Sequence, residues 1–129
     1  MSAIRVLVVD DDAGSRELLS EVLAANGYVV ATAADGAAAH EELARDGGYE
    51  IVIADLRMPN GTGLDLLREL RYRHQRQDLI LMSSFMTGPE KEQALELGAR
   101  ALLEKPFRLT ELLAVVGGLA EERQVGFKV

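Results

Sequence analysis

The sequence predicts an α/β fold with a doubly wound, five-stranded parallel sheet and five helices. Short aliphatic runs recur without alternating polar residues, as in parallel strands that are covered on both faces. Segments with a helical apolar period separate these runs, and alternating strands and helices favour parallel strands joined by right-handed crossovers. The predicted strands, in chain order, are Ile4–Val9, Tyr28–Ala33, Ile51–Ala54, Leu79–Met82 and Ala101–Leu103.

Helical patterns fill the intervals after these strands. An apolar stripe over residues 18–23 is followed by Gly27, which stands where that helix would end. Leucines recur with a helical period over residues 64–70, and the best-defined stripe covers residues 109–119. The two remaining helices are predicted less strongly, because their segments are rich in alanine and charged residues: 37–44 and 90–97.

Length and composition indicate a single domain. The chain has 129 residues, of which 48% are hydrophobic, so it can bury its own core without a disulfide or a structural metal. We therefore expect one domain over residues 1–129, with a core at about 3–122 and a short C-terminal tail at 123–129. The absence of cysteine excludes a disulfide framework, a thiolate metal site and a cysteine nucleophile.

Charge and hydropathy limit the classes of partner that we expect. The formal net charge is −7 at pH 7, and an acidic chain is repelled by the phosphate backbone of nucleic acids. We therefore expect no direct nucleic-acid partner and no membrane partner. The apolar run that ends before Asp10 is too short for a signal peptide, and no apolar stretch of the sequence reaches the length of a membrane span. A cytoplasmic location is expected.

Chemically active side chains follow the predicted strands at their carboxyl ends. Asp10 and Asp11 follow the first strand, Asp55 follows the third, and Ser83 and Lys105 close the fourth and fifth. Ligands of an open doubly wound sheet bind outside the carboxyl ends of the strands, where the strand order reverses. With the order 2-1-3-4-5 this point lies between strands 1 and 3. The three aspartates are therefore expected to meet, with the serine and the lysine on the same rim.

Crowded carboxylates at one rim predict a particular chemistry. Their mutual repulsion is relieved by a hard divalent cation, and Mg²⁺ prefers oxygen ligands. One carboxylate is then available as a nucleophile towards a phosphoryl group, whose charge Lys105 would neutralise and to which Ser83 would donate a hydrogen bond. The sequence therefore predicts phosphoryl acceptance on Asp55 beside a Mg²⁺ site that includes Asp10 and Asp11.

At these positions the chain resembles the receiver domains of bacterial two-component response regulators, which have the flavodoxin-like fold of CheY. The resemblance covers nearly the whole chain. Four motifs carry it: Val6-Leu-Val-Val-Asp-Asp-Asp12, Asp55-Leu-Arg-Met-Pro59, Leu81-Met-Ser-Ser84 and Lys105-Pro-Phe107.

The resemblance implies a role for each residue of the site. Asp55 would accept a phosphoryl group from the phosphohistidine of a sensor histidine kinase or phosphotransfer protein, which makes an aspartyl phosphate. Asp10, Asp11 and Asp55 would hold Mg²⁺, with the backbone carbonyl of Arg57 as a further ligand. The residues expected to contact the phosphoryl group are Ser83 and Lys105.

The resemblance also implies a signalling switch in a phosphorelay. Such a domain is not an enzyme, beyond slow self-catalysed phosphotransfer and dephosphorylation. Phosphorylation would change the face formed by the fourth helix, the fifth strand and the fifth helix, and this face would act on a downstream effector domain or protein. A phosphorylation-dependent homodimer through the same face is a further expectation. The Lys105–Pro106 peptide is expected to be cis.

The chain departs from the usual family pattern at three places. Gly61-Thr62-Gly63 replaces Met-Asp-Gly, which predicts a looser loop into the third helix. Leu102 stands where the family usually has Tyr or Phe, a ring that turns inward on activation, and its simplest interpretation is a plain strand residue. The apolar bulk of Phe85, two residues after Ser83, is predicted to slow hydrolysis of the aspartyl phosphate.

Other interpretations remain open. Taken singly, Asp12 can cap a helix and Ser83 can satisfy backbone groups. The set Asp10-x-Asp12, Ser83 and Lys105 also imitates a phosphatase of the haloacid dehalogenase type, although Asp55 would then have no role. A receiver-like binding module with a vestigial site is a second alternative. A flavodoxin-like FMN binder is a third, which the acidic rim disfavours because it would repel the cofactor phosphate.

Overall fold

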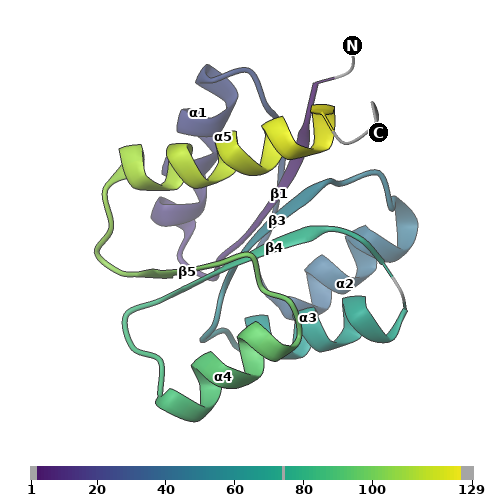
Figure 1. Ribbon diagram of the computed structural model, residues 1–129, viewed down its shortest axis with the longest axis vertical. Helices are drawn as coiled ribbons and strands as arrows, with labels where there is room; N and C mark the ends of the chain where they lie inside the picture. The colour runs from purple at the N-terminus through teal and green to yellow at the C-terminus, as the bar shows by residue number, and fades with distance from the viewer. Residues whose placement is uncertain (1–2, 74, 126–129) are drawn as a thin grey trace.

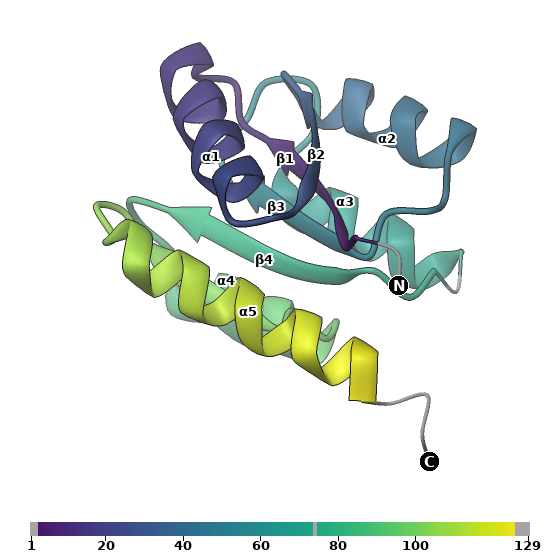
Figure 2. The ribbon, with the colours of Figure 1, turned by 90° about the horizontal axis from the view of Figure 1, so that it is seen from above.

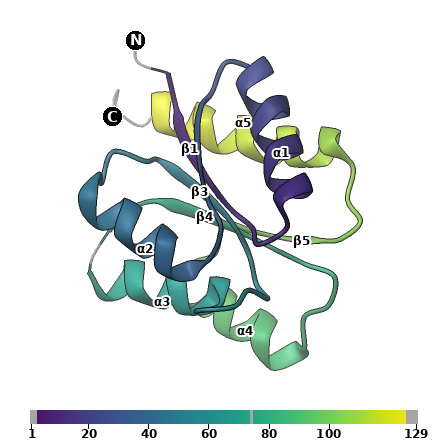
Figure 3. The ribbon, with the colours of Figure 1, turned by 180° about the vertical axis from the view of Figure 1, so that it is seen from behind.

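The computed structural model describes residues 3–73 and 75–125, and it confirms the predicted fold. Within these residues five strands and five helices alternate, and the strands form one parallel sheet of order β2-β1-β3-β4-β5. Helices α1 and α5 cover one face of the sheet, and α2, α3 and α4 cover the other (Figures 1 and 3). The elements are β1 Arg5–Val9, α1 Ala13–Ala25, β2 Val29–Ala33, α2 Gly36–Arg45, β3 Ile51–Asp55, α3 Gly63–Tyr72, β4 Asp78–Ser83, α4 Gly88–Glu96, β5 Ala101–Glu104 and α5 Leu109–Val125.

Two hydrophobic layers explain why the strands lack alternation. On the α1–α5 side, Val6, Val8 and Ile53 pack with buried residues of both helices. On the other side, Leu7 and Val52 pack with residues of α2, α3 and α4. Figure 2 looks onto the first layer, with α4 behind α5 on the far side of the sheet. Because both faces are covered, successive residues of a central strand are all buried.

The ends of the elements differ slightly from the predicted ones. Strands β3, β4 and β5 each extend one residue further, so that Asp55, Ser83 and Glu104 are their last residues. Helix α5 runs to Val125, past the predicted end of the core at 122, and residues 126–129 of the predicted tail lie outside the described residues. Among the described residues, no helix combines the length and apolarity needed to span a membrane.

The loop into α3 is held by specific hydrogen bonds, and its looseness relative to the usual family pattern stays a prediction. Thr62 caps α3 by accepting from the Asp65 amide at 3.0 Å, and the Asp65 carboxylate accepts from the Thr62 amide at 3.1 Å. The Asn60 side chain donates to Asp35 at 3.2 Å, which ties the loop to the start of α2. This reciprocal capping satisfies two amides that would otherwise lack partners.

Candidate functional site

The connections that leave β1, β3, β4 and β5 gather at one edge of the sheet, on the left of Figure 1. In the register of β1 and β3, Val9 pairs with Ala54, so Asp10 and Asp55, each the next residue along its chain segment, come to lie side by side. Lys105 follows β5 and reaches back across the end of β4 to both. The fold therefore brings together the acidic residues and the lysine that the sequence placed at these strand ends.

An acidic cluster forms the centre of the site. Asp10, Asp11 and Asp55 offer carboxylate oxygens that all lie within 4.8 Å of one another. Asp10 is fully buried and Asp55 is 7% exposed, whereas Asp11 is exposed. The cluster thus combines two carboxylates withdrawn from water with one that faces it, and their repulsion needs a cation close by.

Lys105 is one such cation. Its Nζ lies 2.6 Å from Asp55 Oδ2 and 3.4 Å from Asp10 Oδ2. Burial works to lower the pKa of Lys105, but the hydrogen bond and the ion pair with Asp55, together with the charge of Asp10, raise the pKa above its ordinary value. The ammonium therefore keeps its charge at neutral pH and screens the two carboxylates from each other.

Backbone amides fix the other oxygens of these carboxylates. Asp10 Oδ1 accepts from the Asp12 amide at 2.9 Å, and Asp55 Oδ1 accepts from the Arg57 amide at 3.1 Å. Asp12 itself caps α1 by accepting from the Ser15 amide at 2.8 Å, and this bond lowers the pKa of Asp12. The interpretation of Asp12 as a helix cap is therefore confirmed, and its side chain is oriented by the helix that it caps.

The donor set of the cluster fits a hard divalent cation. Three carboxylates from two adjacent strand ends face one another, and oxygen ligands of this kind suit Mg²⁺. Asp10, Asp11 and Asp55 are the residues that would hold the ion. The predicted contribution of the Arg57 carbonyl stays a prediction.

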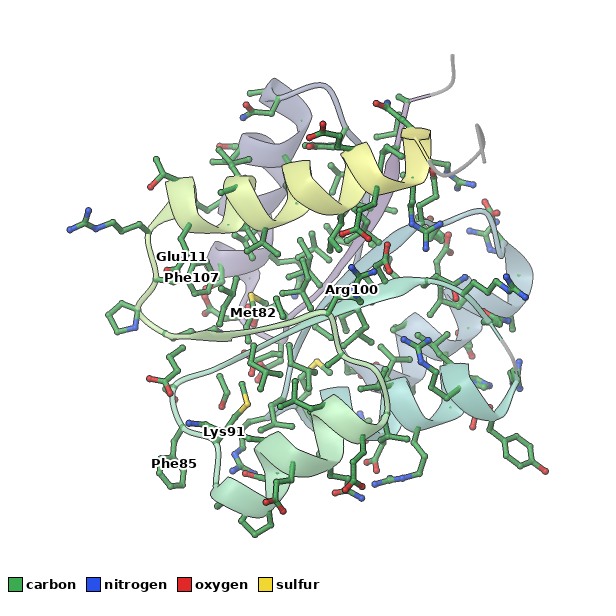
Figure 4. All side chains as sticks on the ribbon, viewed as in Figure 1. Met82, Phe85, Lys91, Arg100, Phe107 and Glu111 are labelled. Atoms are coloured by element: carbon green, nitrogen blue, oxygen red, sulfur yellow. The ribbon has the colours of Figure 1, made fainter. Side chains whose placement is uncertain are left out.

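Ser83 is a predicted site residue, but its hydroxyl bonds to the backbone of Phe85 and not to the acidic cluster. Its side chain is buried, and its Oγ donates to the Phe85 carbonyl at 2.7 Å and accepts from the Phe85 amide at 3.1 Å. The hydroxyl therefore closes the turn after β4, and the contact of Ser83 with a phosphoryl group stays a prediction. Phe85 itself points outward, with 64% of its surface exposed (Figure 4).

Two further expectations from the sequence concern Leu102 and the Lys105–Pro106 peptide. Leu102 is partly buried and packs against the core cluster on the α2–α4 side, as a plain strand residue would. The Lys105–Pro106 peptide is cis, as the resemblance implied.

Sequence reasoning missed an apolar groove of about 430 Å³ beside Lys105. Leu18 of α1 and Phe107 and Leu109 near the start of α5 line it, and Met82 contributes from β4. Phe107 and Met82 are labelled close together in Figure 4. Leu18 was part of an apolar stripe, which gave no sign that its side chain is 49% exposed.

Comparison with known proteins agrees with this geometry. The family model described as response regulator receiver domain matches residues 6–117. The response regulator MprA of Mycobacterium ulcerans is 39% identical over 112 residues, which cover 87% of this chain and 48% of that protein. The transcriptional regulatory protein CusR of Escherichia coli is 34% identical over 113 residues, which cover 88% of this chain and 49% of that protein. The chain thus spans about half the length of the curated relatives it matches.

Solved structures agree as well. The chemotaxis protein CheY4 of Vibrio cholerae superposes with a TM-score of 0.84 at 28% sequence identity, over 92% of this chain and 99% of that chain. The similarity therefore extends over nearly all of both chains.

Proposed function

The chain belongs to the response regulator receiver domains, a family of phosphoacceptor switches in two-component signalling rather than classical enzymes, and from this premise we propose that Asp55 is the phosphoacceptor. One observation carries the proposal: the Asp55 carboxylate belongs to an acidic cluster and has the Lys105 ammonium 2.6 Å away. A carboxylate held beside a fixed positive charge is placed to attack phosphorus.

The transfer step follows from these positions. An oxygen of Asp55 forms a bond to phosphorus as the bond from phosphorus to the donor imidazole nitrogen breaks, and the electron pair of that bond stays on the nitrogen. Lys105 moves from pairing with the free carboxylate to pairing with the phosphoryl oxygens, whose charge it offsets in the loose, in-line transition state. The Arg57 amide holds the second Asp55 oxygen and fixes the direction of attack.

A divalent cation would complete the charge balance of the site. Asp10, Asp11 and Asp55 would hold Mg²⁺, with the Arg57 carbonyl as a further ligand, and the ion would neutralise charge on the phosphoryl oxygens. Ser83 would have to exchange its bonds to Phe85 for a bond to the phosphoryl group. Such an exchange would move the turn between β4 and α4, and so carry the signal to the α4–β5–α5 face.

The partners follow from the same chemistry. The donor is proposed to be a phosphohistidine on a sensor histidine kinase or phosphotransfer protein, and the apolar groove lined by Leu18 and Phe107 offers a contact surface beside Lys105. CusR is named a transcriptional regulatory protein, and for this chain we likewise propose a downstream effector domain or protein. A homodimer through the α4–β5–α5 face after phosphorylation is the corresponding proposal for assembly.

The test is labelling with a small phosphodonor. The chain is incubated with a low-molecular-weight acyl phosphate and Mg²⁺, and its intact mass is measured. We expect one phosphoryl group per wild-type chain and none on Asp55→Asn, because the amide is not a nucleophile of this kind. Label on both proteins, or on neither, would overturn the assignment. Repeated turnover of p-nitrophenyl phosphate would instead indicate a phosphatase.

Phe85→Glu is expected to hydrolyse its aspartyl phosphate several-fold faster than wild type, which is less than the roughly 10²–10⁴-fold that a fully positioned general base contributes. The exposed ring lies two residues past Ser83, and a carboxylate there can accept a proton from the attacking water, which an apolar ring cannot. The decay of the labelled mass after removal of the donor measures the rate. Phe85→Leu is the control and should decay like wild type; equal decay of Phe85→Glu and wild type would contradict the idea.

A further inference from the structure

A chain of three contacts joins the acidic cluster to helix α4. The Arg57 amide donates to Asp55 Oδ1 at 3.1 Å, and the Arg57 guanidinium pairs with Glu90 at 2.8 Å. The same Glu90 oxygen accepts from the Thr87 amide at 2.9 Å, within the capping box that begins α4. A single residue, Arg57, thus contacts the proposed phosphoacceptor with its backbone and α4 with its side chain.

The charge of Arg57 matters because of what lies next to it. Three carboxylates and one ammonium leave the cluster with a formal charge of −2, from −3 for the aspartates and +1 for Lys105. The Arg57 side chain is 52% exposed, so it is free to reorient towards that charge unless another anion holds it. Glu90 is the anion that holds it. Its pairing with Arg57 therefore keeps a guanidinium out of competition with a bound cation.

Helix α4 is suited to respond to this contact. Ala94 is its only residue buried among those described, whereas α3 buries five. Its C-terminal end is fixed by the Arg71 guanidinium, which donates to the Leu97 carbonyl at 2.8 Å and to the Gly98 carbonyl at 3.3 Å. With little apolar packing and one end held, the N-terminal turn is the part whose position the Arg57–Glu90 pair controls.

We propose that Glu90 is a positioning residue of the phosphoacceptor site: it holds the Arg57 guanidinium away from the acidic cluster, and through this pair occupancy of the site is coupled to the first turn of α4. This inference rests on the proposed function. When the site gains a phosphoryl group, the added negative charge draws Arg57 from Glu90, and the first turn of α4 loses its attachment to the β3–α3 loop.

The first test is Mg²⁺ affinity, measured by calorimetric titration without a phosphodonor. Glu90→Gln keeps the capping box, which accepts glutamine, but removes the charge that holds Arg57. We expect it to weaken Mg²⁺ binding about 1.5- to 5-fold, the range that an exposed ion pair gives. Arg57→Met removes the competing guanidinium but keeps the backbone carbonyl that is the proposed ligand, and it should bind Mg²⁺ more tightly than wild type. The double variant should bind like Arg57→Met alone.

The opposite signs exclude a merely structural role, which would weaken binding in both single variants. The matched control is Arg68→Met, because Arg68 is 48% exposed and pairs at 3.0 Å with Asp65, the corresponding capping-box residue of α3. It should bind Mg²⁺ like wild type. Weakening by Arg68→Met, or a Glu90→Gln effect that persists in the Arg57→Met background, would overturn the inference.

The second test is hydrogen exchange of α4 with and without label on Asp55. Wild type should exchange faster over residues 88–92 once labelled, with no change over residues 94–98, which Arg71 holds. Arg57→Met should show no response to the label. Intact mass distinguishes failure of the proposed function from failure of the coupling. Failure to label wild type defeats the proposed function. Normal labelling with an equal α4 response in Arg57→Met defeats only the coupling.

Discussion

Lys105→Met is expected to slow phosphoryl acceptance on Asp55 by about 10²–10³-fold, the effect of removing one preorganised stabilising group from a transition state. Methionine keeps most of the length and apolar stem of lysine but leaves the phosphoryl oxygens without the ammonium that lies 2.6 Å from Asp55 Oδ2. The initial rate of labelling by a small phosphodonor at saturating Mg²⁺ measures the effect. A rate equal to that of wild type would remove Lys105 from the mechanism.

Two further variants separate charge from geometry at this position. Lys105→Arg keeps the charge but replaces a compact ammonium with a planar fork, so its rate should lie between those of wild type and Lys105→Met. Lys91→Met removes an ammonium that pairs with Glu104 at 3.4 Å, outside the acidic cluster, and should label at the wild-type rate. Equal loss in Lys91→Met would show that net charge, rather than the placement of Lys105, sets the rate.

The position of Lys105 could be predicted because it depends on topology. The carboxyl ends of parallel strands lie at one edge of a sheet, so residues at or just after the ends of β1, β3 and β5 meet once the strand order is known. The strands themselves could be recognised because both of their faces are buried, which leaves uninterrupted aliphatic runs such as residues 51–54. The prediction that Asp10, Asp55 and Lys105 lie together needed no knowledge of side-chain conformation.

What the sequence could not supply depends on the conformation of single side chains. The Ser83 hydroxyl had two partners within reach, its own turn and the rim, and the structure pairs it with Phe85. The capping box at Thr62 was missed because Asp65, three residues after the cap, stands where the motif usually has Glu or Gln. Arg57 and Glu90 are 33 residues apart, and no periodicity relates them.

Gly63→Ala is expected to lower the free energy of unfolding by about 1–3 kcal/mol, the usual cost of forcing extra volume into a packed site. A Cβ at this first residue of α3 would lie 2.7 Å from the Asp55 carbonyl oxygen and 2.7 Å from Leu81 Cδ2. The leucine side chain can shift, but the carbonyl belongs to the backbone of a buried central strand. The strain therefore falls on Asp55 itself, and we expect slower labelling of the folded variant as well.

Gly118→Ala is the matched control, because a Cβ at this position in α5 would meet no heavy atom within 4 Å apart from the adjoining residues and backbone of its own helix. Alanine in an open helical position should instead stabilise the chain by about 0.5–1 kcal/mol, since it restricts the unfolded chain more than glycine does. Urea unfolding of both variants and wild type measures the three free energies. Opposite signs at positions 63 and 118 would show that the close approach of α3 to the end of β3 requires glycine, and that the glycine before Leu64 keeps Asp55 in place. A gain in stability at both positions would mean that β3 and α3 can separate without cost, and the rigid placement of Asp55 on which its reactivity depends would then need another cause.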